Sequence, residues 1–294
     1  YKRQQSIIEL PNGKILVGGT FTGFDGVSQA GIVRLNADGT LDTSFNSGNA
    51  GVFGGNRAVK AIAVDANGKI MIGGNFGLYN NDRARMFCRL NSDGTYDTDF
   101  MNALLANHYS MLNTTVTSII AQSDGYVLGG NFTTWGEGPQ NAYITVARAR
   151  IIKIKTNGEE DKAFYANIYP GSGNGFNSSI TCMTELEDGS IMLGGSFNDL
   201  ISGPGLELHG IARLFSDGRL DTSMNTGFYG FNSGVNAIAI SGNDLWVGGY
   251  FTGFAFSGAG DYIAKMNLTS RVSVNSGKGD NDLTNSYIEI KQYN

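Results

Sequence analysis

The stretch "GGTFTGF", Gly18–Phe24, is the strongest indication of the fold, because the chain repeats it four more times. The later copies are, in chain order, "GGNFGLY" from Gly73, "GGNFTTW" from Gly129, "GGSFNDL" from Gly194 and "GGYFTGF" from Gly248. Successive Gly-Gly pairs lie 55, 56, 65 and 54 residues apart, which is longer than a leucine-rich, ankyrin or tetratricopeptide repeat. The chain is therefore a tandem array of five units.

The composition is that of a folded protein rich in tight turns. Among 294 residues, 41% are hydrophobic and 43 are glycine, whereas only 4 are proline. Charged residues make up 16%, the formal net charge is -5 and no basic run is present, so we expect no nucleic-acid partner. No run approaches the ~20 apolar residues of a membrane span, so we expect no membrane insertion. The chain begins at Tyr1 without a recognisable signal peptide, and its first residues do not report its localisation.

Each unit begins with two short apolar runs around a turn. In the second unit, "VKAIAVDANGKIMIGGNF" from Val59 to Phe76 alternates apolar and polar residues, breaks at Asn67-Gly68 and then resumes. Asn-Gly between two such runs predicts a hairpin with a type I′ turn, in which both residues have positive φ. The same turn recurs at Asn12-Gly13, Asp124-Gly125 and Asp188-Gly189.

A third and a fourth strand complete the predicted unit. Runs such as "GIVRLN" from Gly31 and "GIARLF" from Gly210 follow the Gly-Gly phrase and predict a third strand. A turn such as "NADGTLD", from Asn36, then leads into a short fourth strand. The fourth strands are expected to end near one apolar residue each: Phe45, Phe100, Phe164 and Met224. Each unit is therefore predicted to be a four-stranded antiparallel sheet.

Repeated four-stranded sheets favour an all-β propeller. No helical periodicity longer than a turn or two is present, and blades arranged around an axis leave only short, protected sheet edges. We place the paired glycines in the second, inner strand, where a side chain would collide with neighbouring blades. The phenylalanines of the repeated phrase are expected to pack between blades: Phe21, Phe76, Phe132, Phe197 and Phe251.

The chain is read as a single propeller domain, residues 1–294, with about five four-stranded blades. The repeats cover approximately residues 1–58, 59–115, 116–179, 180–234 and 235–285. The remaining stretch "SYIEIKQYN", residues 286–294, aligns with the first strand of a further unit. Two arrangements stay open: a ring that closes with five blades, the final strand completing the last one, or a piece of a longer ring. We expect five blades.

The units resemble the delta-60 repeats, a β-propeller family. The resemblance rests on the hairpin, "GGxF", "ARLN" and "DGxLDxSF" pattern, which the first, second and fourth units match almost fully. It extends from about Ser6 to Asn275, although the third unit has a longer loop and the fifth, with "KMNLTSRVSVN", lacks the Asp-Gly turn. The resemblance implies a large secreted or surface protein of bacteria or phages, no general enzymatic activity, and usually more than five blades. Function does not follow from such a fold alone.

Aspartates recur in the turns after the third strands. They are Asp38, Asp93 and Asp217 before a glycine, and Asp42, Asp97 and Asp221 four residues later. Oxygen ligands at alternate positions are also typical of calcium loops, but calcium takes about 6 to 8 oxygens and often a bidentate glutamate, which these turns lack. We therefore expect the aspartates to accept backbone hydrogen bonds, and we expect no metal.

The chain offers little material for catalysis. His108 and His209 are its two histidines, and Cys88 and Cys182 lie in apolar runs that predict buried, unpaired thiols. Acids outside the repeated turns show no motif spacing: Glu137, Glu185, Glu187, Asp199 and Glu207. We predict no catalytic residues and no cofactor, and keep a propeller glycosidase as a lesser alternative.

The loops after the repeated phrase differ in length and content, and in a propeller they emerge on one face, which we take as the functional surface. Three residues past the phenylalanine stands an aromatic residue in four units: Phe24, Tyr79, Trp135 and Phe254. These rings either fill the gap between neighbouring blades or form an exposed platform for sugar rings or a partner protein.

The third unit carries the longest loop, between Phe132 and Lys153. It combines residues that can stack on a sugar or hydrogen-bond its hydroxyls: Trp135, Glu137, Gln140, Asn141 and Tyr143. The same residues would serve a protein contact, and "AYITVARARIIKI" also fits a merely longer hairpin strand, so these interpretations stay open.

The sequence thus predicts a non-enzymatic binding or adhesion module on a bacterial or phage surface, with an extracellular, cell-surface or virion location. Its partner is expected to be a surface glycan or protein. The alternative is a structural component of a larger extracellular or virion assembly, in contact with neighbouring subunits. Exposure of Trp135 and Tyr79 would favour ligand capture, whereas a broad apolar face would favour assembly.

Overall fold

The structure, a computed structural model, describes most of the chain. The described residues are 3–109, 111–168, 175–201, 205–225, 230–252 and 262–267. Five three-stranded antiparallel sheets, which we call the first to fifth blades, follow one another along them, one for each repeat. Their strands are β1 (Arg3–Glu9), β2 (Ile15–Thr20) and β3 (Ile32–Leu35); β5 (Ala58–Val64), β6 (Ile70–Asn75) and β9 (Phe87–Leu90); β11 (Val116–Gln122), β12 (Gly125–Gly130) and β15 (Ile151–Lys155); β16 (Ile180–Glu185), β17 (Ile191–Gly195) and β18 (Ile211–Leu214); β19 (Val235–Ser241), β20 (Asp244–Gly249) and β21 (Ile263–Asn267).

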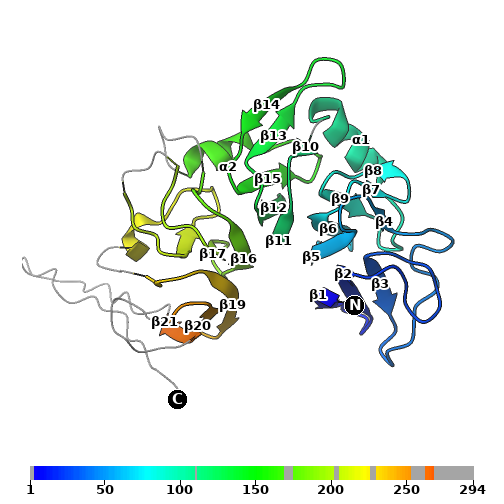
Figure 1. The fold of residues 1–294 in the computed structure, drawn as a ribbon, viewed down its shortest axis with the longest axis horizontal. Helices are drawn as coiled ribbons and strands as arrows, with labels where there is room; N and C mark the ends of the chain where they lie inside the picture. Colours follow the sequence, from blue (N-terminus) through cyan, green and yellow to red (C-terminus); the bar gives the residue numbers. More distant parts are fainter. Residues whose placement is uncertain are drawn as a thin grey trace, which may run out of the picture.

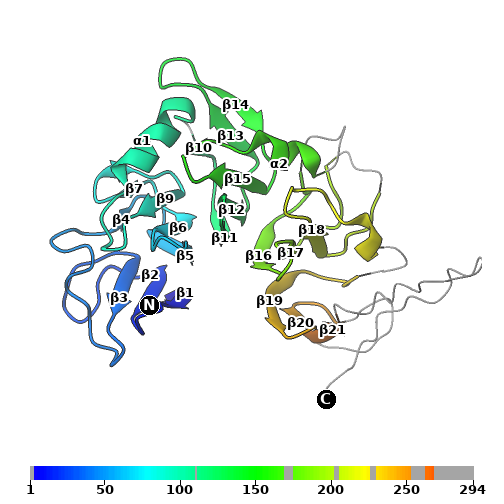
Figure 2. The ribbon, with the colours of Figure 1, turned by 180° about the vertical axis from the view of Figure 1, so that it is seen from behind.

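The five blades succeed one another along an arc (Figure 1). The view from behind shows the same succession, with the first and fifth blades at the two ends (Figure 2). The first strands β1, β5, β11, β16 and β19 lie on the inner side of the arc and pack against strands of neighbouring blades. This corrects the expectation that the glycine strand is the inner one, because that strand is the middle strand of each blade.

The two glycines of each pair are required for different reasons. In the second blade, a Cβ on Gly73 would lie 2.6 Å from Val116 Cγ1, so the first glycine makes room for the third blade. A Cβ on Gly74 would lie 1.9 Å from the carbonyl oxygen of Ala58, in the first strand of its own blade. The pairing register of β5 and β6 shifts at this point, so the second glycine accommodates a β-bulge.

The Asn-Gly hairpin turns differ from the predicted type I′ turn. Only the glycine has positive φ, 74° at Gly13 and 75° at Gly68. The amide of Gly68 donates to the Asp65 carbonyl at 2.9 Å, which makes a longer loop that ends in a left-handed glycine. Asp65 stabilises this loop, because its Oδ1 accepts the amide hydrogens of Asn67 and Lys69.

Short helical segments replace the predicted fourth strands. They are α1 (Thr98–Asn107), α2 (Lys162–Asn167) and a 3₁₀ turn (Thr222–Asn225). The cause is capping: the Asp97 carboxylate accepts the Phe100 amide hydrogen at 3.4 Å, and that of Asp161 accepts the Phe164 amide hydrogen at 3.2 Å. The blades therefore have three strands rather than four in the part of the chain that the structure describes.

Two small sheets lie outside the blades, toward the outer rim of the arc (Figure 1). Their strands are β4 (Val52–Phe53), β7 (Leu78–Tyr79) and β8 (Asp82–Arg83), and β10 (Met111–Leu112), β13 (Thr134–Glu137) and β14 (Ile144–Ala147). Each of these sheets pairs the end of one repeat with the loop of the next repeat. The closing stretch 286–294 lies outside the described residues.

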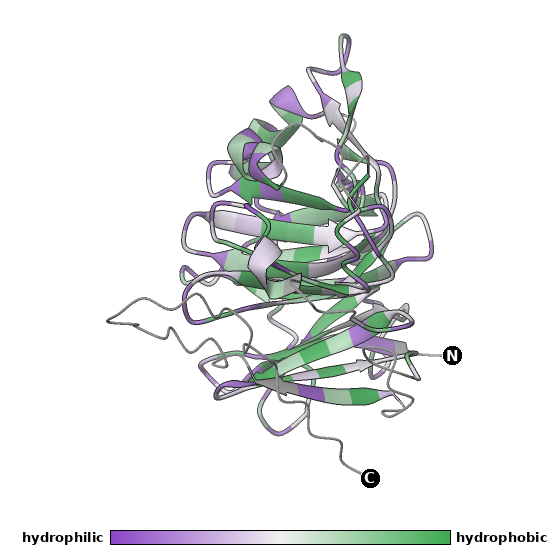
Figure 3. Ribbon diagram, turned by 90° about the vertical axis from the view of Figure 1, so that its left-hand side faces the viewer, coloured by the Kyte–Doolittle hydropathy of each residue, from purple (hydrophilic) through white to green (hydrophobic). Residues whose placement is uncertain are grey.

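The core lies within and between the blades. The phenylalanines of all five phrases are buried, as predicted. Phe197 meets Phe176, from the end of the preceding repeat, with ring centroids 4.7 Å apart, and this confirms packing between repeats at that position. Figure 3 shows hydrophobic residues concentrated in the strands and hydrophilic ones in the turns.

The two cysteines are free thiols, as expected, with Cys88 buried and Cys182 half-buried. Burial raises the pKa of the Cys182 thiol to about 12. Among the described helices, none is long and apolar enough to cross a membrane.

Candidate functional site

The turn aspartates accept hydrogen bonds from their own turns, which confirms the capping interpretation. Oδ1 of Asp38 accepts hydrogen bonds from the hydroxyl and the amide of Thr40 at 2.6 and 3.0 Å, and these bonds lower the pKa of Asp38. Asp93 and Thr95 repeat this arrangement in the second blade. No group of three or more His, Cys, Asp or Glu side chains is placed to hold a metal ion in the ranges given above.

The second aspartate of the turn lies in an ion pair that the sequence reasoning missed. Asp42 Oδ2 is 2.7 Å from both Lys14 Nζ and Arg34 Nε, and the Asp42 side chain is 6% exposed. Burial alone would raise the pKa of Asp42, but hydrogen bonds from Lys14, Ser44 and Arg34 outweigh burial and hold it well below its usual value. Asp42 is therefore a structural anion.

The second blade holds its aspartate in the same way. Asp97 Oδ2 lies 2.8 Å from Arg89 Nε and 2.9 Å from Lys69 Nζ, and the Arg89 guanidinium lies 3.8 Å from the centroid of Phe100. The arginine precedes the aspartate by eight residues in both blades, a spacing that could have revealed the pair. The "DGxLDxSF" stretch therefore serves the fold.

Trp135 and Tyr79 are fully buried, which corrects the expectation that they could form an exposed platform. The Trp135 ring centroid lies 6.1 Å from that of Phe87 and 4.7 Å from that of His108, both in the preceding repeat. Tyr79 donates its hydroxyl to the Gly94 carbonyl at 2.6 Å. Burial of such large apolar rings is strongly stabilising, so Trp135 holds two repeats together and Tyr79 anchors its loop to the Asp-Gly turn, and neither presents a face to a ligand.

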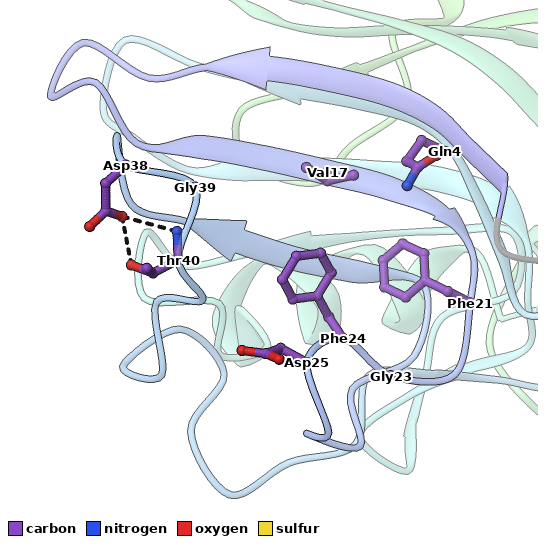
Figure 4. Close-up of a pocket in the computed structure, with 9 residues that line it drawn as sticks. All are labelled: Gln4, Val17, Phe21, Gly23, Phe24, Asp25, Asp38, Gly39 and Thr40. Carbon is purple, nitrogen blue, oxygen red and sulfur yellow. Dashed lines mark hydrogen bonds between the residues drawn. The ribbon is translucent and has the colours of Figure 1, made fainter.

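Phe24 and Phe254 follow the repeated phrase at the same position as Tyr79 and Trp135, but the structure does not place them with those two rings. Phe24 is half-buried and lines a cavity of about 460 Å³ on the first blade, beside Phe21 and Val17 (Figure 4). Phe254 lies outside the described residues. The structure therefore does not gather these rings into one surface.

The remaining predicted residues lie together on the hairpin formed by β13 and β14. Gln140 and Asn141 are exposed in its loop, while Tyr143 and Ile144 are 45% and 63% exposed. The ring of Tyr143 lies 6.1 Å from that of Tyr109, between centroids. We call these five residues the hairpin site. Sequence pattern could not indicate Tyr109, because this residue belongs to the preceding repeat and joins the site only through the fold.

Backbone hydrogen bonds fix the hairpin site to the end of α1. The Gly138 amide donates to the Asn107 carbonyl at 2.6 Å, and the Tyr109 amide donates to the Gly138 carbonyl at 3.2 Å. Arg83 donates to the Tyr109 carbonyl at 2.8 Å, and its guanidinium lies 3.7 Å from the centroid of the Tyr109 ring. The exposed side chains therefore stand on a well-bonded base.

Glu137, also predicted as a ligand-binding residue, belongs to this base. Its carboxylate is 3.1 Å from both Arg148 Nη2 and Lys162 Nζ. Arg148 also pairs with Glu160, whose pKa is raised by burial in spite of that hydrogen bond. Glu137 thus neutralises the cations beneath the hairpin.

Several of the residues considered for catalysis make contacts within the fold. Glu185 accepts a hydrogen bond from a glutamine of the third repeat at 2.8 Å, and Asp199 accepts backbone amide hydrogens of its own loop. Glu207 lies 4.0 Å from His209. Burial lowers the pKa of His108, whose Nδ1 is 3.2 Å from a backbone carbonyl. Each of these contacts has a structural explanation.

Comparison with known proteins bears on the fold. A protein-family model described as a domain of unknown function (DUF5122) that forms a β-propeller matches residues 10–45 and 66–100. The first segment spans the hairpin turn, the second and third strands, the Gly-Gly pair and the aspartate turn of the first repeat, and the second segment covers the corresponding part of the second repeat. No curated protein sequence matches the chain.

A search of solved structures found weak similarities. The computationally designed Ika8 protein has a TM-score of 0.44 and 11% identity, covering 90% of this chain and 71% of its own. The C-terminal WD40 domain of Sif2 has a TM-score of 0.39 and 13% identity, and the match covers 91% of this chain and 67% of that domain's chain. The WD40 β-propeller domain of Doa1 has a TM-score of 0.32 and 10% identity, and the match covers 84% of this chain and 89% of that domain's chain. The five repeated antiparallel sheets make this an all-β protein, and the partial match to a β-propeller family model supports a propeller fold.

Proposed function

We propose that the protein is a non-enzymatic binding module whose hairpin site binds a protein partner on the outside of a bacterial cell or a phage particle. The observation that carries this proposal is the exposure of two large apolar side chains, Tyr143 and Ile144, on a hairpin that projects at the outer rim (Figure 1). Apolar residues exposed beside polar ones are typical of protein interaction sites.

Two features favour a protein over a glycan. The burial of Trp135 and Tyr79 leaves Tyr143 as the most exposed ring of the site, whereas sugar rings are bound best by a broad aromatic face. In the described part of the chain, β14 is the outer strand of its sheet, so its free edge can pair with a strand of a partner protein. A surface glycan is then an outcome that the experiment must be able to reveal.

A different observation favours the alternative, a structural component of a larger assembly. Large apolar side chains are exposed at both ends of the arc: Ile7 in the first blade, and Tyr250, Tyr262 and Ile263 in the fifth. Such residues are suited to contact with neighbouring subunits. The two proposals place the contact surface in different parts of the molecule, the outer rim of the third repeat or the ends of the arc, and one pair of variants separates them.

The test compares a hairpin variant with a matched control. Tyr143→Ala/Ile144→Ser removes the apolar surface of the hairpin site, and Tyr250→Ala/Ile263→Ser makes the same chemical change at the fifth blade. Fluorescently labelled protein is bound to intact cells or particles of the source organism, untreated, protease-treated or periodate-oxidised. We expect binding to be lost in the hairpin variant and after protease, and to persist in the control variant and after periodate.

The opposite pattern contradicts the proposal. Loss of binding in the fifth-blade variant alone would support the assembly role. Loss of binding after periodate but not after protease would identify a glycan. A circular dichroism spectrum and a melting curve for each variant confirm that only the surface has changed.

A further inference from the structure

Each junction between successive blades in the arc is built in the same way on its inner side. Two side chains from the first strand of a blade, three residues apart, cover the first glycine of the preceding blade. The pairs are Val59 and Ile62 over Gly18, Val116 and Ile119 over Gly73, Ile180 and Met183 over Gly129, and Val235 and Ile238 over Gly194. These contacts are asymmetric, so every blade has one face that covers and one face that is covered.

The outer side of each junction runs in the opposite sense. The Phe45 ring lies over the turn of the second blade, where a Cβ on Gly94 would be 2.7 Å from the ring. The amide of Asn46 donates to the Asp93 carbonyl at 2.8 Å, and Arg34 Nη1 donates to the Ser92 carbonyl. The aromatic segment of one repeat therefore docks on the Asp-Gly turn of the next.

The later junctions repeat this docking. A Cβ on Gly158 would meet the Phe100 carbonyl oxygen of α1 at 3.0 Å, and Arg89 Nη1 donates to the Thr156 carbonyl at 3.1 Å. A Cβ on Gly218 would meet the Phe164 carbonyl oxygen at 2.1 Å. Turn glycines of the second, third and fourth blades are thus all covered by the preceding repeat.

The first blade has the same turn without such a cover. Gly39 has φ of 85°, like Gly94, but nothing among the described residues lies within 4 Å of a Cβ placed on it. The cavity of about 460 Å³ opens beside this turn, with the rings of Phe21 and Phe24 and the side chain of Val17 at its wall (Figure 4). On the inner side of the same face, Ile7 is 64% exposed.

We propose that this open face of the first blade is an interaction surface for a further repeat unit of the kind that this chain contains. The phenylalanine of that unit enters the cavity between Phe24 and Gly39, as Phe45 covers Gly94. The residue after it donates its amide hydrogen to the Asp38 carbonyl, as Asn46 does to Asp93. The covering unit also supplies a glycine against which Ile7 packs.

The fifth repeat, from this molecule or a second copy, does not have the chemistry of this occupant. In sequence, "VSVNS" from Val272 stands where the first repeat has "LDTSF" from Leu41, so it brings neither the aspartate nor the phenylalanine. The occupant we propose is therefore a unit that carries an Asp-x-Ser-Phe segment like Asp42–Phe45 of the first repeat. This favours the longer ring over closure with five blades, the two arrangements that the sequence left open.

The test adds such a unit to the full chain. A second copy of residues 3–57 is inserted directly before Arg3, because Arg3 occupies the register position of Ala58. The melting temperature should rise, and the amide hydrogens of Ile7 and Thr40 should exchange at least about tenfold more slowly than in the unextended protein. Both effects should disappear when Phe45→Ala is made in the added copy alone.

A second substitution locates the docking site. Phe24→Ala in the original first blade should lower the melting temperature of the extended protein more than that of the unextended one, because only the extended protein fills the cavity. No gain in melting temperature, or a gain that does not depend on the added phenylalanine, would overturn the proposal. So would sedimentation showing that the unextended protein dimerises with protection of Ile7 and Thr40, because the occupant would then be a second copy.

Discussion

The first and second blades are built from the same repeat, but among the described residues only the second is covered on the face that receives the preceding blade. Ile62 of the second blade is 5% exposed, whereas Ile7, at the same register position of the first, is 64% exposed. Tyr79 is fully buried, whereas Phe24 is half-buried. A blade therefore does not bury its own faces, and stability arises at the junctions between blades.

The largest expected difference concerns the aromatic residue of the loop. Tyr79→Ala should lower the free energy of unfolding by about 3–5 kcal/mol, because it opens a cavity at a covered junction and removes a buried hydrogen bond. Phe24→Ala should lower it by only about 1 kcal/mol, because Phe24 is half-buried beside an open cavity. Denaturant unfolding of the two variants measures both values.

Equal losses of unfolding free energy in the two variants would contradict the difference between the two blades. They would mean that Phe24 is as well packed as Tyr79, and that the first blade is covered. The slope of the unfolding curve serves as the control, since an unchanged slope shows that neither variant has altered the surface exposed on unfolding.

The next largest effect separates the first glycines of two blades. Gly73→Ala should cost about 1–3 kcal/mol, because its Cβ would press on Val116 and Ile119 at 2.6 and 2.8 Å. Gly248→Ala should change the stability by less than about 0.5 kcal/mol. Among the described residues, the atoms nearest to its added Cβ are the Tyr262 carbonyl oxygen and Ala237 Cβ, at 3.7 and 3.9 Å. Thermal unfolding of the two variants checks the difference.

The second glycine of each pair is expected to matter in every blade, because its contacts lie within that blade. A Cβ on Gly249 would lie 2.3 Å from the carbonyl oxygen of Gly234, within its own blade, just as one on Gly130 would lie 2.2 Å from that of Thr115. Gly249→Ala should therefore destabilise the fifth blade although its neighbour Gly248→Ala does not. If Gly249→Ala were tolerated, the bulge would be more adaptable than the contacts indicate.

The smallest predicted effect depends on pH. The pKa of Asp42 is held below its ordinary value of 3.8, so its ion pairs stabilise the fold above about pH 4 and lose this contribution as the pH falls toward the folded-state pKa. Lys14 is one-third exposed, so we expect the contribution to be under about 1 kcal/mol. Asp42→Asn should lower the stability at neutral pH and flatten its decline in acid, as measured by denaturant midpoints. A variant with an unchanged acid profile would contradict the assignment.

The sequence revealed the repeat, the antiparallel hairpins and the burial of the phenylalanines, because these follow from local pattern and turn chemistry. It could not reveal that Asp97 and Asp161 begin helices, because a capping aspartate and a turn aspartate look alike without the geometry that follows them. The sequence pattern also could not predict which strand of each blade lies on the inner side of the arc, since the inner position of β5 depends on contacts with β11 in another repeat.

The candidate site was foreseen only in part. Gln140, Asn141 and Tyr143 were identified from the length of the third loop, and they do lie together. Trp135, six residues from Asn141, is buried instead, because Phe87 and His108 of the preceding repeat receive its ring. Pattern alone cannot distinguish an aromatic residue that packs on the next repeat from one that faces solvent.

Hydrogen exchange along the inner strands of the full chain tests most directly the claim that junctions stabilise the blades and that the first blade is open. β11 packs against strands of the second and the fourth blade. In the described part of the arc, the second blade is the one neighbouring blade that β1 packs against. The amides of Ile7 and Ile8 should exchange at least about tenfold faster than those of Ile119 and Ile120. Equal protection of the two strands would show that the first blade is covered, and would contradict the account.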